Sequence, residues 1–559
     1  MTAPVEALAP LTQADDADHT FPVLSEAQLA RITQFGQRRP VLAGEVLVDA
    51  GAPVTHFYVV LSGAIEGVQL RDAGGIRVRT LRAGQFTGEV SMLSGRPALV
   101  TIRVCQDGEI VEIDRDRLLG VIQTDADLSE VLVRAFLLRR VGLISGGFAD
   151  VVLVGSNHSS DTLRIKEFLT RNAHPYASVD PDHDASVQEL LDHFRFSLTD
   201  LPVLICRNTA VLRNPTNHEI ADCLGFNASI DQTHTRDVVI VGAGPSGLAA
   251  AVYAASEGLD VLVIESTSPG GQAGSSSRIE NYLGFPSGIT GNELTGRAYT
   301  QAQKFGADIA IAENAVHLNC TPKAYKVKLD TGVEVHARTI VIATGAQYRK
   351  LPLSNLAQFE GVGIYYGATF IESQLCEGDE AIVVGGGNSA GQAAVFLAQT
   401  ARHVHMLVRS RGLAESMSRY LIRRIEENAR ITLHTCTEII DLDGDSHLER
   451  VQWRTDGGPI ESHEIRHVFV MTGAEPTTGW LAGCVTLDAK GFVKTGSDLS
   501  PEELASAKWP LSRPPHLLET SRPGVFAVGD VRAGNVKRVA SAVGEGSIAI
   551  SFVHSALQE

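Results

Sequence analysis

Short apolar runs separated by glycines occupy the first quarter of the chain. Residues 45–48, 56–61 and 77–81 are such runs, and glycines lie between them. Regular short strands with glycine turns are typical of a small barrel or roll. A helical pattern over residues 118–143 follows, so the sequence predicts a β-roll closed by a helix.

From Asp150 the pattern changes to strands that alternate with helices. Alternation of this kind predicts a small α/β domain around a central sheet. The predicted strands cover residues 151–154, 176–179 and 202–206, and the predicted helices cover 161–172, 187–194 and 218–224.

Two further strand–helix–strand patterns begin at Val238 and at Ala381, after a polar linker over 228–235. The chain closes with a glycine-rich strand and turn over 524–530 and a helix of small residues from Val539. At 559 residues the chain is too long for a single core, so several domains are expected.

Charge and cysteine usage narrow the class of protein. A formal net charge of -17 argues against a general nucleic-acid binder, because phosphate contacts need clustered Lys and Arg. No stretch approaches the roughly 20 apolar residues of a membrane span, and no signal peptide is expected. The 7 cysteines are scattered, so we expect neither a disulfide framework nor a metal site, and we expect a cytoplasmic location.

The first glycine motif directly follows the strand predicted at 238–241. Gly242, Gly244 and Gly247 have the Gly-x-Gly-x-x-Gly spacing, with Pro245 and Ser246 between them. The glycines permit a tight turn, close approach of a pyrophosphate and close packing of the following helix. The second strand ends in Glu265, whose carboxylate is placed to accept hydrogen bonds from a ribose. This pattern predicts a dinucleotide site.

The second glycine motif has the same frame. It comprises Gly385, Gly387, Asn388, Ser389 and Ala390. Val408 lies as far after Gly385 as Glu265 lies after Gly242, so it occupies the position of the ribose-binding acid. Arg409 and Arg411 follow it. Loss of the acid beside two arginines favours a 2′-phosphate and hence NADPH, although a solvated basic turn would have the same sequence. Two dinucleotide sites in one chain predict two cofactors that exchange a hydride, FAD and NADPH.

These motifs resemble the thioredoxin reductase family of flavoproteins, from about Arg236 to Ala556. The resemblance implies a flavin domain interrupted by an NADPH domain. It also implies further flavin contacts along the motifs at 270–272, 279–281, 343–345, 529–530 and 538–540. The residues so implied are Gly271, Gln272, Asn281, Thr344, Gly345, Gly529, Asp530, Arg538, Val539 and Ala540.

One departure from that family concerns its redox cysteines. Gly367 and Phe370 occupy the two positions of the family's Cys-x-x-Cys motif. A dithiol relay needs a thiolate and a second thiol to resolve the disulfide, and neither residue provides one. The chain therefore more resembles the branch without the dithiol, which includes ferredoxin–NADP reductases of this type. Cys376 is solitary and is expected to be a buried small residue. Tyr365, Tyr366 and Phe370 suit either an apolar lid near the flavin or core packing.

The two N-terminal domains resemble known families as well. Residues 21–140 resemble the cyclic-nucleotide-binding domain through the motifs at 43–47, 56–63 and 88–93. There Gly88 and Glu89 would hold the ligand, but Ala98 occupies the slot of the phosphate arginine and Arg96 is displaced to the other side of Pro97. The alternative is a vestigial or protein-contacting module.

Residues 150–224 resemble a thioredoxin or glutaredoxin fold. Leu201-Pro202 lies where that fold carries a cis-proline, and residues 155–160 lack the active cysteines. Such a domain either docks a partner or spaces the other domains.

The expected fold is therefore a multidomain α/β protein with two Rossmann-like domains, a β-roll and a thioredoxin-like domain. The predicted domains are a mobile tail at 1–20, the roll at 21–145, the thioredoxin-like domain at 150–227, the flavin domain at 236–349 and 481–559, and the NADPH domain at 350–480.

The expected function is an FAD-dependent oxidoreductase that takes a hydride from NADPH. The acceptor is open among a ferredoxin, a flavodoxin, a quinone, oxygen and a protein disulfide. The alternative is a redox- or nucleotide-responsive sensor with little turnover. By resemblance we expect a homodimer, and a cyclic nucleotide remains a candidate partner.

Overall fold

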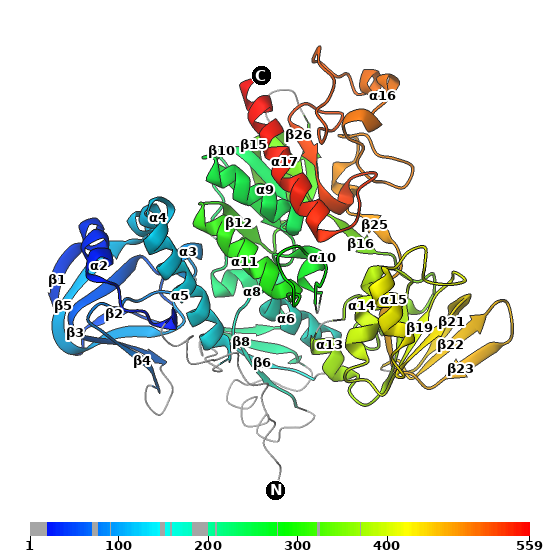
Figure 1. Ribbon diagram of the computed structural model, residues 1–559, viewed down its shortest axis with the longest axis horizontal. Helices are drawn as coiled ribbons and strands as arrows, with labels where there is room; N and C mark the ends of the chain where they lie inside the picture. The colour runs from blue at the N-terminus through cyan, green and yellow to red at the C-terminus, as the bar shows by residue number, and fades with distance from the viewer. Residues whose placement is uncertain are drawn as a thin grey trace, which may run out of the picture.

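The computed structural model describes residues 19–69, 76–89, 91–145, 151–156, 159–181, 200–206, 210–227, 229–276, 278–320, 325–368, 370–445 and 447–559. Most of the predicted tail and the helix predicted at 187–194 lie outside these ranges. In Figure 1 the β-roll lies on the left, a dinucleotide-binding fold in the centre and a second such fold on the right, with the small α/β domain below the centre. No described helix is long and apolar enough to cross a bilayer.

The N-terminal domain is an antiparallel roll, which we call the roll domain. The strand order is β1-β5-β3-β4, with β2 paired to β5. The helix expected over 118–143 is two helices, because Asp125 ends α4 and its carboxylate accepts the Leu128 N–H at the start of α5. The elements are α2 (Glu26–Ile32), β1 (Gln37–Val41), β2 (Val46–Val48), β3 (His56–Gln69), β4 (Ile76–Arg82), α3 (Ser91–Ser94), β5 (Thr101–Asp114), α4 (Arg115–Thr124) and α5 (Ala126–Ser145).

The next domain, the small α/β domain, has a four-stranded sheet in the order β7-β6-β8-β9. Only β6 and β7 are parallel, and the Leu201–Pro202 peptide bond is cis, as the thioredoxin-like resemblance implies. One face of α6 is buried in this domain through Ile165, Phe168 and Leu169. The elements are β6 (Val151–Val154), α6 (Ser160–Arg171), β7 (Ala177–Val179), β8 (Val203–Cys206), β9 (Ala210–Arg213) and α8 (Asn217–Leu224).

The central domain is built on a seven-stranded sheet, β12-β11-β10-β15-β14-β13, with β26 added beside β15. Strands β12, β11, β10, β15 and β26 are parallel. Helices α9, α11 and α17 cover one face of their apolar runs, and β13, β14 and residues 480–493 cover the other. The elements are β10 (Thr235–Val241), α9 (Pro245–Ser256), β11 (Val261–Glu265), α10 (Gly271–Gly274), α11 (Gly291–Lys304), β12 (Asp308–Ile311), β13 (Ala315–Asn319), β14 (Tyr325–Leu329), β15 (Glu334–Ile342), β26 (Val525–Ala527) and α17 (Val539–Gln558).

The second dinucleotide-binding fold is inserted into the central domain. Its parallel sheet has the order β17-β24-β18-β19-β20, and a three-stranded antiparallel sheet, β21-β22-β23, packs beside it. The two crossings between the domains lie side by side, because β16 (Ala346–Tyr348) pairs with β25 (Ala474–Pro476). The remaining elements are β17 (Ile364–Tyr365), α13 (Phe370–Leu375), β18 (Glu380–Val384), α14 (Asn388–Leu397), β19 (His403–Leu407), α15 (Arg419–Glu426), β20 (Ile431–His434), β21 (Thr437–Asp443), β22 (Arg450–Thr455), β23 (Ile460–His463) and β24 (His467–Val470).

The small α/β domain shares a core with the central domain. Ile311 and Ala312, at the end of β12, belong to the same buried cluster as Phe168 and Phe226. The side-chain amide of Asn227 donates to the Ile311 carbonyl at 2.7 Å and accepts the Ile311 N–H at 2.8 Å. Since β12 is the edge of its sheet, Asn227 takes the place of a neighbouring strand there.

Arg96 ties the roll domain to both of these domains. Its guanidinium donates to the Asn172 carbonyl at 3.1 Å and to the Tyr299 hydroxyl at 3.2 Å, and it lies 4.1 Å from the centre of the Phe226 ring. The side chain is buried. The displaced arginine of the roll domain is therefore an interdomain contact.

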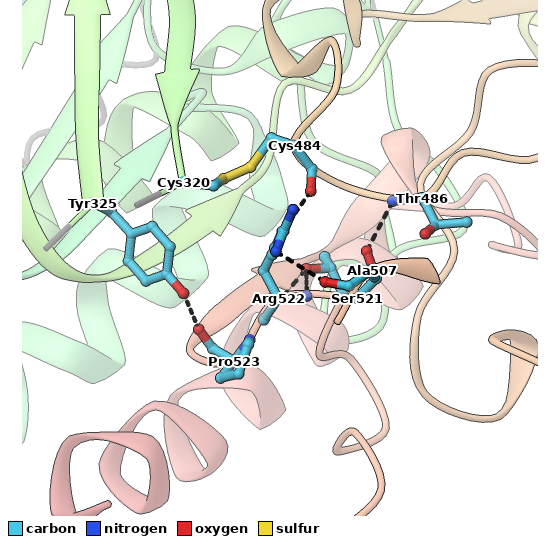
Figure 2. The surroundings of a disulfide bond; sticks show 9 residues. Cys320, Tyr325, Cys484, Thr486, Ala507, Ser521, Arg522 and Pro523 are labelled. Carbon is cyan, nitrogen blue, oxygen red and sulfur yellow. Dashed lines mark hydrogen bonds between the residues drawn. A yellow bond between two sulfur atoms is a disulfide. The ribbon is translucent and has the colours of Figure 1, made fainter. Parts of the chain in front are cut away.

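A disulfide joins Cys320 to Cys484, with Cα atoms 5.8 Å apart (Figure 2). Our expectation that the chain has no disulfide framework did not foresee this pair. The two residues are 164 positions apart, and they meet because Cys484 follows the short 3₁₀ turn Gly479–Leu481, which contacts β13. Arg522 Nε donates to the Cys484 carbonyl at 2.9 Å. Spacing along the chain cannot reveal a pairing of this kind.

Candidate functional site

A cavity of about 860 Å³ opens where the central domain, the inserted domain and the small α/β domain meet. Most of the predicted flavin-binding residues line this cavity. They are Gly242, Gly244, Pro245, Ser246, Glu265, Gly271, Gln272, Asn281, Thr344, Gly345, Asp530, Arg538, Val539 and Ala540. Gly247 and Gly529 do not line the cavity.

The first glycine motif has the geometry that a pyrophosphate needs. Gly242 has φ +105°, in the left-handed region that favours glycine, and the turn leads into α9 with Gly244 as its N-cap. Among the described residues no side chain caps this helix end, which leaves its first N–H groups open to a ligand. A helix start of this kind binds anions through its N–H groups and dipole.

Glu265 is buried at the end of β11 and holds the glycine loop in place. Its carboxylate accepts the N–H groups of Ala243 at 2.8 Å, Thr267 at 2.9 Å and Ser268 at 3.2 Å. Burial raises the pKa of Glu265, and these three hydrogen bonds oppose the rise. The residue expected to meet a ribose therefore also fixes the loop that would hold the pyrophosphate.

The C-terminal motif begins at the end of β26 and reaches α17. Gly529 has φ +73°, and its N–H donates to Glu545, which also pairs with Arg532 at 2.6 Å. Burial raises the pKa of the neighbouring Asp530, while Lys537 opposes the rise. Lys537, which the sequence analysis did not select, lines the cavity and donates to the Asp530 carbonyl at 3.1 Å.

Only part of the second glycine motif reaches this cavity. Asn388 and Ser389 line it, whereas Gly385, Gly387 and Ala390 do not. Tyr348 also lines it, and a hydrogen bond from Ser389 opposes the rise that burial causes in the Tyr348 pKa. The start of α14 thus opens on the same space as the flavin motifs.

The two arginines after β19 lie outside the cavity. Arg409 and Arg411 are exposed, and within the described ranges neither makes an ion pair. Val408, in the slot of the ribose acid, is buried against Gly386. An exposed pair of free guanidinium groups beside the second glycine motif is suited to a 2′-phosphate.

The first of the two cysteine slots faces the cavity. Gly367 lines it together with Tyr365, Tyr366 and Ser275, and a Cβ on Gly367 would lie 4.0 Å from the Ser275 Cβ. Phe370 begins α13, and its side chain is outside the described part of the structure. Among the described lining residues there is no cysteine. Cys376 is fully buried in the core of the inserted domain.

Tyr365 and Tyr366 make packing and hydrogen-bonding contacts within the inserted domain. Tyr365 is buried and packs against Phe469 with ring centres 5.3 Å apart, and the Tyr366 hydroxyl donates to Glu360 at 2.7 Å. Burial beside this carboxylate raises the pKa of Tyr366. Both also line the cavity.

A helix of the small α/β domain forms a wall of the cavity that sequence reasoning missed. Ser160, Leu163, Arg164, Glu167 and Arg171 of α6 line it. Their spacing is that of one helical face, opposite the buried face of α6. In the sequence this face is indistinguishable from a solvent-exposed one, so no signal identified it.

The predicted nucleotide site of the roll domain is engaged by protein groups. Glu89 pairs with Arg140 at 3.5 Å, and Arg140 donates to the Ala173 carbonyl of the small α/β domain at 2.7 Å. Gly88 has φ +98°. The neighbouring α3 contacts α11 of the central domain.

Comparison of the sequence with protein-family models assigns the chain to a family. Residues 236–546 match the model described as pyridine nucleotide-disulphide oxidoreductase. The chain belongs to this family. Residues 38–125 match the cyclic nucleotide-binding domain.

Relatives of this oxidoreductase are thioredoxin reductases. It is 34% identical over 329 residues to "Thioredoxin reductase" of Mycolicibacterium smegmatis, covering 57% of this chain and 96% of that one. It is 32% identical over 357 residues to "NADPH-dependent thioredoxin reductase 3" of Arabidopsis thaliana, covering 61% of this chain but only 63% of the relative.

Solved structures agree with this assignment. The crystal structure of Lactococcus lactis thioredoxin reductase in the FR conformation matches with a TM-score of 0.52 and 25% identity, over 58% of this chain and 99% of that one. The crystal structure of T. acidophilum thioredoxin reductase matches with a TM-score of 0.51 and 27% identity, over 58% of this chain and 99% of that one.

Family membership establishes the cofactors and the class of enzyme. The family uses FAD and NADPH, so this oxidoreductase is an NADPH-dependent flavin enzyme of the thioredoxin reductase type. The cavity fits that pair, because one glycine cradle with a buried acid and the start of a second glycine motif open on the same space.

Proposed function

We propose that this protein takes a hydride from NADPH and passes the electrons from its flavin directly to an acceptor, without an internal dithiol relay. The observation that carries the proposal is the cavity wall at Gly367, where a slot of the family's redox cysteines holds a residue with no side chain. A relay through sulfur needs a thiolate and a second thiol to resolve it. Cys376 supports neither role, because it is buried in the core.

Bound FAD and NADPH supply the hydride chemistry, and the residues of this chain supply position and electrostatics. Gly242, Gly244 and the start of α9 would hold the FAD pyrophosphate, and Glu265 would meet the ribose. Asp530 and the start of α17 would hold the middle of FAD. Asn388 and Ser389 would hold NADPH, and the guanidinium groups of Arg409 and Arg411 would pair with its 2′-phosphate.

Anaerobic titration of the purified protein tests this function. We expect NADPH to bleach the flavin band at one equivalent per chain, and we expect NADH to do so far more slowly. An acceptor screen should then find turnover with a ferredoxin, a flavodoxin, a quinone, oxygen or a protein disulfide other than that of thioredoxin. Rapid reduction of thioredoxin by the full-length protein would contradict the proposal, and so would a protein that binds no FAD.

A second candidate function is a nucleotide-responsive regulator, and the contacts of Glu89 favour it. A cyclic nucleotide at Gly88 and Glu89 would compete with Arg140, which also holds the small α/β domain through Ala173. The helix α3 beside this site contacts α11, which packs on α10 at the cavity. A ligand there would therefore act on the flavin domain through packed elements.

Cyclic AMP and cyclic GMP are the probes for this candidate. If either binds, the rate of flavin reduction by NADPH should change, and Glu89→Gln should abolish that response to the nucleotide. Absence of binding to the full chain by calorimetry would remove the candidate and leave the roll domain as a protein contact.

A further inference from the structure

The face of α6 that lines the cavity contacts both dinucleotide-binding domains. Leu163 packs against the buried cluster of the inserted domain, and a Cβ on Gly361 would lie 2.7 Å from the Ser160 Cβ. At its other end α6 reaches the central domain through Arg171. The helix is therefore part of the cavity wall and is held at both ends.

Arg171 lies where two glycine segments of the flavin motifs meet. Its Nη2 donates to the Gly271 carbonyl at 2.9 Å, and a Cβ on Gly271 would lie 3.2 Å from the Gly244 Cα. Gly244 is the N-cap of α9. Arg171 also interacts with the Glu265 carboxylate, whose pKa it lowers against the effect of burial.

The hydrogen-bonding capacity of Arg171 is not used up by the protein. Its Nη1 pairs with Glu167 at 3.2 Å, and its Nε is buried and has no hydrogen-bond partner in the described part of the chain. A buried guanidinium N–H without an acceptor is costly, unless a bound group supplies one.

The charges at this end of the cavity favour a pyrophosphate as the group that Arg171 would bind. A pyrophosphate carries two negative charges, and Glu265 lies beside its cradle. Two of the other lining cations are engaged elsewhere, because Lys350 pairs with Glu360 and Lys537 donates to the Asp530 carbonyl.

We propose that Arg171, supplied by the small α/β domain, is an FAD-binding residue that pairs with the pyrophosphate of the cofactor. A guanidinium matches the geometry of phosphate oxygens, and its hydrogen bonds to them are charge-assisted. This gives the small α/β domain a function that needs no cysteine: it completes the flavin site of the reductase.

The test compares Arg171→Ala with the matched variant Arg164→Ala in the full chain. Arg164 is on the same face of α6, but its guanidinium is bound within its own domain, to Asn217 at 3.0 Å and to the Pro215 carbonyl at 2.8 Å. FAD affinity of the apoprotein is measured by quenching of flavin fluorescence, and FAD content by the ratio of absorbance at the flavin and protein bands. Thermal unfolding of the apoprotein reports whether each variant folds.

We expect Arg171→Ala to weaken FAD binding about 10- to 100-fold, as loss of a charge-assisted hydrogen bond implies. Arg171→Lys should keep part of the affinity, and Arg164→Ala should keep nearly all of it. Equal FAD affinity in Arg171→Ala and the wild type would overturn the inference, and so would an equal loss in Arg164→Ala. A wild-type chain that binds no FAD would instead overturn the cofactor assignment itself.

Discussion

Replacement of Arg96 by alanine should loosen the roll domain from the rest of the molecule. The guanidinium is buried among three domains, and it donates to the Asn172 carbonyl and the Tyr299 hydroxyl while it stacks on Phe226. Alanine removes both donors and leaves these acceptors without their partner.

The size of the effect follows from these contacts. Hydrogen bonds from a charged donor are worth about 1.5–3 kcal/mol each, and a desolvated cation–π contact is worth about 2 kcal/mol. The cost of burying the charge, which alanine also removes, offsets part of this sum. We therefore expect a loss of about 3 kcal/mol, which corresponds to a urea midpoint lower by about 1 M or more.

The assay must report on each domain separately, because a chain of this size need not unfold in one step. Pulsed hydrogen exchange with mass spectrometry over a urea series does so through peptides from β3 and β5 of the roll domain and from β18 of the inserted domain. Arg96→Ala should lower the first midpoint and leave the second unchanged. Arg38→Ala, at an exposed site on β1, is the control. An unmoved roll-domain midpoint, or an equal shift in the control, would refute the reasoning.

Three further predictions concern other parts of the molecule. Thiol titration of the unfolded, unreduced protein should find five free cysteines, and reduction should raise the count by the Cys320–Cys484 pair; a count of seven before reduction would remove the disulfide. Arg409→Glu should raise the KM for NADPH about 10-fold or more and change the KM for NADH little; equal effects on both would contradict a 2′-phosphate contact. Burial lowers the pKa of His405 and His434 from the ordinary 6.5, so the unfolded chain takes up protons more readily, and stability of the inserted domain should fall as the pH drops below about 6.5. In the double variant with glutamine at both positions, the urea midpoint of β18 peptides should depend less on pH; an unchanged dependence would contradict the assignment.

The cofactor motifs could be predicted because their chemistry is local. Gly242 and Gly244 are followed by the start of α9 within a few residues, and Glu265 ends the next strand in the same unit. A short stretch of sequence therefore fixes both the turn and the helix that would meet the pyrophosphate. The same local logic predicted β2 and β4 of the roll and β6, β7 and β8 of the small α/β domain to within a residue or so at each end, but it missed β1 and β5 and most of the second half of β3.

Contacts between domains could not be predicted, because they depend on residues that are far apart in sequence. The displacement of Arg96 was visible, but its partner Tyr299 belongs to another domain. Arg171 had the pattern of a solvated helix position, and only the packing of α6 against the central domain places it beside Gly271. Cys320 and Cys484 meet for the same reason, since the inserted domain separates them in sequence but not in space.

The pairing of Asn227 with Ile311 has a consequence for anyone who wishes to isolate the reductase half. A shortened chain that begins at Arg236 would lose this amide and leave the backbone of β12 unpaired along the rim of its sheet. It would also bare Ile311 and Ala312, which Phe226 and its neighbours now cover. An unpaired edge strand next to an exposed hydrophobic patch promotes self-association. Such a fragment should therefore aggregate even though both glycine motifs are intact.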